Sequence, residues 1–452
     1  MNHIEIAQPF GGDSMKKTCY KISAFLLMLL LLFPAVSARA EMPVINGSSS
    51  ITFDMDTREL IYTKDIDRKV YPASITKLLT ALVFSDHYSA KKTEYLTYPQ
   101  EGKLVVPNAI YWNLKNIPVG TEFSADDIMH ALLIPSFNDA SVVVAINVAG
   151  SEEAFVELMN EKAKELGMAN SHFVNPSGLH DDNHYTTAYD LMFLLEAAYK
   201  DPWIREVSSK QSYELKTKTQ TLGLIESTNK HVGLHGNIMG KTGYTGEAGR
   251  CFAGVYQRDG RTIGSIILDS TDDRVNVLVF EDIFKVVNNA FEEEKIIKLS
   301  KAEEVGVISV TYKPYFIFGP TKEMEIPVKA EDTISYYAND VNLSESDLVF
   351  TYKDVTAKEV KVDSVVGEAS IKERLVEKKV NLLSTVDVSA RILKTHLLSY
   401  ILIVLVTITV IVTVLVVTIK RRRRKLTRRR RIEAARKNKR YVDERSKKGF
   451  LE

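Results

Sequence analysis

The sequence predicts an α+β fold in which helices flank an antiparallel sheet, followed by a small β-rich domain and a C-terminal transmembrane helix. Residues 73–200 contain long apolar runs with helical spacing, and alternating strand patterns stand on both sides of them. Residues 305–388 are rich in Val, Ile, Tyr and Thr and alternate again. Residues 397–419 form an uncharged run of 23 residues, which as a helix is long enough to cross a bilayer.

The N-terminal segment predicts export. Two lysines at positions 16 and 17 precede the apolar run ISAFLLMLLLLFPAV, and Ala38-Arg39-Ala40 supplies a small-x-small cleavage site. We therefore expect residues 1–40 to be a secretory signal peptide that is cut before Glu41. Met15 stands immediately before the lysines and offers a second start of translation.

Between the signal and the membrane segment we expect two domains. A hairpin of residues 51–54 and 59–62 opens the first domain, and a helix over 275–291 closes it. The charged joint EEEKIIKLSKAEE then leads into the β-rich segment. The expected limits are 41–292 for the larger domain and 293–390 for the β-rich domain, which carries no catalytic motif and reads as a spacer or docking module.

Charge is unevenly distributed along the chain. Its net charge is +1, but residues 420–452 carry 17 basic and 4 acidic side chains, so this tail has +13 and the preceding part has −12. A basic tail beside a membrane helix stays in the cytoplasm. We expect a single-pass protein of the cell membrane, with its domains outside the cytoplasm and its C-terminus inside. The acidic folded part argues against binding of anionic lipid through that part, and topology explains the basic tail without a nucleic-acid partner.

The first chemical motif is Ser74-Ile75-Thr76-Lys77. Pro72 and the apolar run after it place Ser74 at the start of a buried helix, where free N–H groups favour developing negative charge. Lys77 lies one turn further on the same face. A lysine there can take the serine proton if burial or a nearby cation keeps it neutral. Taken alone, Ser74 is equally well explained as a helix N-cap.

The second motif is Ser136-Phe137-Asn138. The capping pattern SADD predicts a helix through about Leu133, Pro135 ends it, and ASVVVAINVAG predicts a second buried helix. The motif is therefore expected on the loop between two helices. A hydroxyl there can relay a proton, and an amide can bond both a lysine and a substrate. The alternative is an ordinary helix–helix turn with Asn138 as its cap.

The third motif, Lys241-Thr242-Gly243, is expected on a strand beside the hairpin formed by RCFAGVYQ, the turn Asp259-Gly260 and RTIGSIIL. A peptide substrate can pair with the backbone of such a strand. Lys241 and Thr242 can hold a terminal carboxylate, and Gly243 allows close backbone approach. The cation of Lys241 would also keep Lys77 neutral. The alternative is a surface strand with an exposed lysine.

The three motifs occur in one order, with gaps of 62 and 105 residues, which is typical of serine acyl-transferases that act on penicillins and cell-wall peptides. Together with YPASITKLLTAL, LLIPSFNDAS, FVNPSGLHDDNHYTTAYDL and GKTGYTGEAG, they make the chain resemble the serine-type D-alanyl-D-alanine carboxypeptidases, the low-molecular-mass penicillin-binding proteins. The resemblance runs from about Ile51 to about Phe291, and more loosely to about Val388. It implies a penicillin-binding/β-lactamase-like fold for the larger domain.

The resemblance also implies an activity and a set of roles. The expected reaction removes the terminal D-alanine from peptidoglycan stem pentapeptides ending in D-Ala-D-Ala through an acyl-serine, without a cofactor, and β-lactam antibiotics are expected covalent inhibitors. The backbone N–H groups of Ser74 and Tyr244 would form the oxyanion hole. Phe137 departs from the family, which commonly has glycine there, and beside the cleft it would narrow substrate choice. The implied catalytic residues are Ser74, Lys77 and Ser136, and the implied substrate-binding residues are Asn138, Lys241, Thr242, Gly243 and Tyr244.

Histidines and cysteines add no further chemistry. His180 and His184, like His231 and His235, have a spacing that on a helix can bind zinc, but neighbouring glycines favour loops, so we expect no metal. Cys251, the one cysteine beyond the signal segment, is expected to be an inert strand residue.

Other functions share the motifs. Class A β-lactamases use a glutamate for deacylation, in that family within E-x-x-x-N after S-x-N, and no such pattern lies between Asn138 and Lys241. A D,D-endopeptidase and a non-catalytic scaffold remain open, and only product analysis separates them from a carboxypeptidase.

Overall fold

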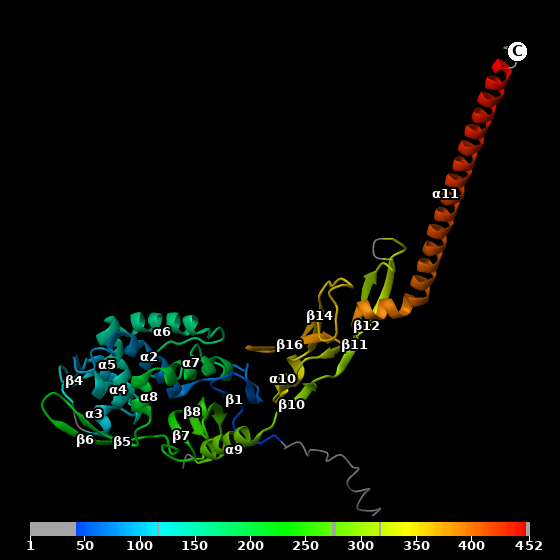
Figure 1. Cartoon of the computed structure of the whole chain (residues 1–452). Helices are drawn as coiled ribbons and strands as arrows, with labels where there is room; N and C mark the ends of the chain where they lie inside the picture. Colours follow the sequence, from blue (N-terminus) through cyan, green and yellow to red (C-terminus); the bar gives the residue numbers. More distant parts are fainter. Residues whose placement is uncertain (1–41, 106, 115–116, 274–276, 316–317, 449–452) are drawn as a thin grey trace, which may run out of the picture. The chain divides into compact units, whose positions relative to one another are not determined.

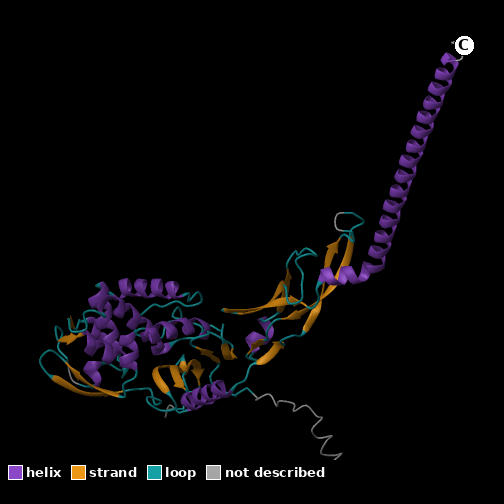
Figure 2. Ribbon diagram, in the orientation of Figure 1, coloured by secondary structure: helices purple, strands orange, loops and turns teal. Residues whose placement is uncertain are grey.

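The computed structural model describes residues 42–448 except residues 106, 115–116, 274–276 and 316–317. The signal peptide expected over residues 1–40 therefore lies outside the described residues. The chain divides into two compact units, one ending at Glu294 and one beginning at Lys295. Figure 2 shows helices and strands mixed in the first unit, and a mainly β second unit that ends in one long helix.

The first unit is built on a five-stranded antiparallel sheet with strand order β2-β1-β9-β8-β7. The predicted first hairpin and the hairpin with the turn Asp259-Gly260 are both present, and the strand that carries Lys241-Thr242-Gly243 forms one edge. The strands are β1 (Ser49–Asp54), β2 (Leu60–Lys64), β7 (Asn237–Thr245), β8 (Gly249–Arg258) and β9 (Arg261–Ser270).

Helices cover both faces of this sheet (Figure 1). Helix α9 packs its buried face on Phe252, Tyr256 and Ile267 of the sheet, and α7 lies on the other side with α2 against it. The expected closing helix begins at Leu278, three residues later than predicted. The principal helices are α2 (Thr76–Tyr88), α4 (Ala125–Leu133), α5 (Asn138–Ala149), α6 (Glu152–Leu166), α7 (Ala188–Lys200), α8 (Pro202–Ser208) and α9 (Leu278–Glu292).

Short elements join these helices and carry part of the site. A single 3₁₀ turn, η1, precedes α2 and lies against β7. Ser124 caps α4 as predicted, because its hydroxyl accepts from the Asp127 amide. The short elements are η1 (Ala73–Ile75), β3 (Tyr95–Thr97), η2 (Glu101–Leu104), α3 (Ile110–Asn113), β4 (Glu122–Ser124), β5 (Ser212–Lys216) and β6 (Thr221–Glu226).

The second unit contains the expected β-rich region. Its five-stranded antiparallel sheet has strand order β11-β12-β16-β15-β14, and β10 pairs with β13. One hydrophobic core joins the sheet to the first residue of the long helix, Val388. The elements are β10 (Ile296–Leu299), β11 (Glu304–Tyr312), β12 (Lys322–Ala330), β13 (Ile334–Tyr336), α10 (Asp340–Glu345), β14 (Leu348–Tyr352), β15 (Val365–Glu373), β16 (Val376–Ser384) and α11 (Val388–Lys448).

Helix α11 extends the predicted apolar helix in both directions. It begins nine residues before the expected span of 397–419, where Val388 is buried in the β core, and it continues into the basic tail as far as Lys448. The apolar side chains of the span are exposed, and α11 is the one helix among the described residues that is long and apolar enough to cross a membrane. An exposed apolar surface of this extent is unfavourable in water.

Candidate active site

The first motif lies on the turn that opens α2. Ser74 is the middle residue of η1, and the residue before it, Ala73, has a left-handed backbone with φ 47°. Pro72 precedes η1, and no side chain caps its first turn. Ser74 therefore does not act as a side-chain cap here, and its hydroxyl is available to Lys77.

Lys77 is fully buried on the first turn of α2 and makes three hydrogen bonds. Its Nζ lies 2.9 Å from Ser74 Oγ, 2.7 Å from Asn138 Oδ1 and 2.7 Å from the carbonyl oxygen of Ser177. Burial lowers the pKa of this amine well below its usual range, and the nearby charge of Lys241 lowers it further, while Asp139 opposes the shift. The structure thus favours the neutral amine that proton abstraction needs.

The three partners of Lys77 also orient its lone pair. The carbonyl oxygens of Asn138 and Ser177 can only accept, and the Asn138 amide nitrogen donates to the Pro107 carbonyl, which settles the orientation of that amide. A neutral amine has two N–H donors, and these two carbonyls use both. The lone pair is then directed at the Ser74 hydroxyl, which can donate its proton to it.

The turn at residues 175–178 supplies one of these carbonyls, and we assigned it no role from the sequence. Asn175 Oδ1 accepts from the Ser177 amide, the Ser177 hydroxyl and the Gly178 amide, which shapes the turn. Gly178 has φ 81°, and a Cβ there would lie 1.9 Å from the Ala73 carbonyl oxygen. Only glycine allows this approach, and the run Asn-Pro-Ser-Gly is a turn signal that marks it in the sequence.

His184 supports the same turn from the other side. Its Nδ1 accepts from the Val174 amide, so its Nε2 carries the hydrogen and donates to Thr76 Oγ1 at 2.9 Å. Burial lowers the pKa of this imidazole to about 4. The neutral ring therefore holds the residue next to Lys77 in place without adding a positive charge to the site.

The second motif lies where α4 gives way to α5. Ser136 has a left-handed backbone with φ 65°, and Asn108 holds this turn because its amide donates to the carbonyls of Pro135 and Ser136. Asn138 is the first residue of α5 and not a loop residue as expected. Its side chain bonds Lys77, and the residue at the cap position is Phe137, so the capping alternative for Asn138 is wrong.

Phe137 does not line an open cleft. Its side chain is only 3% exposed, packed in the interior at the start of α5. We expected Phe137 to lie beside the cleft and to narrow substrate choice. That expectation is wrong, because Phe137 follows the left-handed turn at Ser136 and its side chain is buried in the core.

Lys241 faces the second motif from β7. Its Nζ donates to Ser136 Oγ at 2.7 Å and to the Thr242 carbonyl at 2.9 Å, and its side chain is 1% exposed. Burial lowers the pKa of this amine to about 7. The alternative of an exposed surface lysine is wrong.

Gly243 brings β7 against the nucleophile turn. A Cβ at this position would lie 2.9 Å from the Pro72 carbonyl oxygen and 3.1 Å from the Ser74 amide nitrogen. Tyr244 follows on the same edge strand, where its ring is partly exposed and its hydroxyl donates to Asp272 at 2.8 Å. The guanidinium of Arg250 lies 3.9 Å from the centre of that ring and also bonds Asp272.

Thr228 contacts the third motif, and the sequence did not predict this contact. Its hydroxyl lies 2.5 Å from Thr242 Oγ1, and its amide donates to the Ile134 carbonyl just before the second motif. The run Ser227-Thr228-Asn229 fits S-x-N by chance in sequence, yet the fold places it beside the edge strand. No local signal distinguishes it, because the contact joins residues 14 positions apart across a loop.

The remaining histidines and Cys251 make structural contacts. His231 Nδ1 bonds the Tyr256 hydroxyl at 2.8 Å, and its ring meets that of His235 edge-on. Cys251 is buried in β8, and burial raises the pKa of its thiol to about 12. Within the described part of the chain, no three His, Cys, Asp or Glu side chains come together as a metal site would require.

Comparisons with known proteins identify the family. Residues 36–272, about half of the chain, match the family model described as Peptidase S11, D-alanyl-D-alanine carboxypeptidase. The chain is 29% identical over 295 residues to the D-alanyl-D-alanine carboxypeptidase DacF of Bacillus subtilis, covering 63% of this chain and 74% of the relative.

A second relative and a solved structure extend the comparison. The chain is 31% identical over 246 residues to a D-alanyl-D-alanine endopeptidase of Pseudomonas aeruginosa, covering 52% of this chain and 75% of the relative. The crystal structure of the Streptomyces K15 DD-transpeptidase matches with a TM-score of 0.52 at 25% identity, covering 56% of this chain and 100% of that one.

Proposed function

This chain belongs to the Peptidase S11 family of D-alanyl-D-alanine carboxypeptidases, and from that premise we propose how its own residues carry out the reaction. It is a serine-type hydrolase whose substrate is the peptidoglycan stem pentapeptide ending in D-Ala-D-Ala. The observation that carries the assignment of residues is the buried amine of Lys77, whose Nζ lies 2.9 Å from Ser74 Oγ and 2.7 Å from the carbonyl oxygens of Asn138 and Ser177. β-Lactams, which imitate the terminal dipeptide, are its covalent inhibitors.

Acylation begins with proton transfer from Ser74 to Lys77. The Ser74 oxygen attacks the carbonyl carbon of the penultimate D-alanine, and a C–O bond forms while the carbonyl π electrons move to the oxygen. We assign the oxyanion to the backbone N–H groups of Ser74 and Tyr244, which Gly243 allows to approach one another. The C–N bond then breaks, and the nitrogen of the terminal D-alanine takes the proton that Lys77 received from Ser74, so that Lys77 is neutral again.

We assign Lys241 and Ser136 to the leaving-group side of this arrangement. The 2.7 Å bond between Lys241 Nζ and Ser136 Oγ supports a role for the hydroxyl as a proton relay to the departing amine. Lys241 and Thr242 bind the terminal carboxylate that distinguishes this substrate from an internal peptide. Water then attacks the acyl ester, which restores Ser74 and releases the shortened peptide.

We also propose that α11 anchors the enzyme in the cell membrane. The exposed apolar span of 397–419 and the basic residues that follow it support one crossing, with the tail in the cytoplasm. Both folded units then lie on the outer side, where peptidoglycan is found.

Product analysis tests the reaction. The full chain in detergent should release one D-alanine from a purified stem pentapeptide, and a fluorescent penicillin should label it covalently. Ser74→Ala should abolish turnover and label while the circular dichroism spectrum is retained. Ser89→Ala is the matched control, since Ser89 heads another S-x-x-K run but is exposed at the end of α2. Full labelling of Ser74→Ala protein would contradict the nucleophile assignment.

Endopeptidase action is the second candidate, because relatives with that name match this chain at similar identity. A cross-linked dimer of stem peptides, offered in the same assay, separates the two. Cleavage of the cross-bridge at a rate equal to or above release of terminal D-alanine would favour the endopeptidase.

A further inference from the structure

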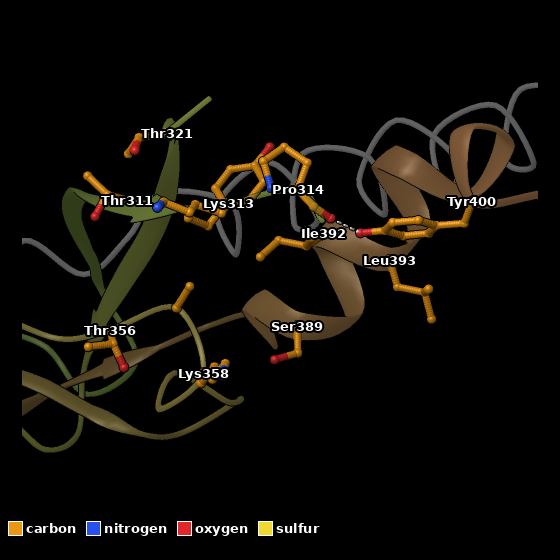
Figure 3. A pocket seen from close by; sticks show the side chains of 12 residues that line it. Thr311, Lys313, Pro314, Thr321, Thr356, Lys358, Ser389, Ile392, Leu393 and Tyr400 are labelled. Carbon is orange, nitrogen blue, oxygen red and sulfur yellow. Dashed lines mark hydrogen bonds between the residues drawn. The ribbon is translucent and has the colours of Figure 1, made fainter. Parts of the chain in front are cut away.

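The second unit contains a pocket at the base of α11 (Figure 3). Its volume is about 860 Å³, and it lies between the ends of β11 and β12, the loop from β14 to β15, and the first turns of α11. The pocket is far larger than a water site and shares no residue with the site around Ser74. It is therefore distinct from that site.

The position of the pocket along α11 puts it where the helix enters the membrane. Tyr400, one of its lining residues, is the fourth residue of the apolar span, and its hydroxyl donates to the Pro314 carbonyl across the pocket. The Tyr400 ring also meets that of Tyr315 edge-on at 6.0 Å. Tyrosines gather at the boundary between water and hydrocarbon, so this pair places the pocket at the headgroup level.

One wall of the pocket is apolar and exposed. Ile392 and Leu393 of α11 line it, and Leu393 remains 56% exposed. An exposed leucine in the wall of a pocket is typical of a surface that contacts lipid or a partner.

The pocket also has cationic and hydroxyl-bearing lining residues. Lys313 and Lys358 line the pocket together with Thr311 and Ser389. Neither ammonium group forms an ion pair with any described residue. Glu359 follows Lys358 in the chain, but its carboxylate accepts hydrogen bonds from the Thr356 amide and hydroxyl. Lysine ammonium groups and hydroxyl donors are the side-chain groups that bind a phosphate.

We propose that this pocket binds an anionic phospholipid from the leaflet that faces the folded units. The phosphate lies between Lys313 and Lys358, and the acyl chains follow Ile392, Leu393 and Tyr400 into the bilayer. Apolar continuity with the membrane helix favours a lipid over a soluble anion, because a soluble ligand has no use for the exposed apolar wall. The proposal rests on α11 being the membrane anchor.

The acidic balance of the folded part does not oppose this site. The charge of −12 over residues 1–419 predicts no general attraction to an anionic surface, but headgroup binding depends on charges within a Debye length, about 8 Å at physiological salt. The two lysines place positive charge at the pocket within an otherwise acidic folded part. Attraction of an anionic headgroup is therefore expected at this pocket and not over the whole surface.

Photolabelling of the full chain tests the proposal. The protein is reconstituted in phosphatidylcholine nanodiscs that contain a small fraction of photoactivatable phosphatidylglycerol, with the reactive group near the headgroup. Peptide mapping should find label in the segments 311–314 and 389–400, at least about fivefold above photoactivatable phosphatidylcholine at the same fraction. Mapping separates this site from attraction of the lipid to the basic tail.

Charge variants complete the test. Lys313→Gln together with Lys358→Gln should remove the preference for phosphatidylglycerol at these segments. Lys322→Gln with Lys361→Gln is the control, since both are exposed lysines outside the pocket. Labelling that is indifferent to headgroup or to the pocket lysines would overturn the lipid site alone. A full chain that does not float with vesicles would overturn the anchor as well, while D-alanine release by that chain would leave the enzymatic proposal standing.

Discussion

The site around Ser74 and the pocket at the base of α11 both contain two lysines, but the lysines are buried in the first and exposed in the second. In the first unit two lysines are buried, each in contact with named acceptors, and burial lowers the pKa of both. In the second unit two lysines are exposed, no ion pair joins them to another described residue, and Leu393 is exposed in the same pocket. Burial favours the neutral amine that can act as a base, whereas an exposed apolar surface is typical of a contact with lipid or a partner.

The largest effect is expected from removing the buried base. Lys77→Met keeps the volume of the side chain but removes the amine, so acylation by a fluorescent penicillin should fall by about 10²–10⁴-fold. The matched change Lys394→Met, on the exposed first turns of α11, should leave the rate unchanged. Equal acylation rates for the Lys77→Met and Lys394→Met proteins would contradict the role of Lys77 as the base.

The second effect concerns the geometry of the base. Gly178→Ala forces a Cβ against the Ala73 carbonyl and should displace Ser177 from Lys77, so acylation should fall at least about tenfold and the melting temperature should drop. Gly167→Ala is the control, because Gly167 is also left-handed, with φ 89°, but its Cβ would meet nothing within 4 Å. That control should show backbone strain of about 1–2 kcal/mol and normal acylation.

The third effect tests the coupling of the two buried lysines. The charge of Lys241 lowers the pKa of Lys77, so Lys241→Ala should raise it and move the acid limb of the acylation rate to higher pH. The same variant should lose its preference for a free terminal carboxylate over an amidated C-terminus, and Lys241→Arg should retain part of that preference. An unchanged pH profile would show that the two amines do not interact.

The fourth effect is on stability. His184 and His231 both have a pKa of about 4 in the fold against an ordinary 6.5, so the folded protein binds fewer protons than the unfolded chain between pH 4 and 6.5. The free energy of unfolding should therefore fall as pH is lowered through this window, by about 3 kcal/mol for His184 at pH 4. Urea titrations of His184→Gln protein should show a shallower slope with pH, and an unchanged slope would exclude this role.

The smallest effect on activity is expected from removing the membrane span. A chain that ends at His396 keeps the buried residue Val388 and the bond between His396 and the Tyr312 hydroxyl. It should be soluble, with acylation within about twofold of the full chain, measured after ultracentrifugation. A chain that ends before Val388 should lose stability in the second unit, since it opens that core. Sedimentation of the His396 form with membranes would contradict the anchor.

The sequence alone was sufficient for features that depend on neighbours in the chain. The cap at Ser124, the hairpin around Asp259-Gly260 and the long apolar helix all follow from local pattern, and the structure has them. The family could be predicted from three ordered motifs, because each motif lies within three or four consecutive residues and can be read locally. Roles for the site residues remain proposals, although the fold brings Ser74, Lys77 and Asn138 together.

Tertiary structure decided the features that depend on distant residues. Lys77 bonds a carbonyl 100 positions away and an amide 61 positions away, and Lys241 bonds a hydroxyl 105 positions away. The roles of Ser177 and Thr228, and the burial of Phe137, could not be predicted because no short pattern encodes which loops meet. The pKa of a lysine is likewise set by what surrounds it, since desolvation is a property of the folded environment and not of the residue.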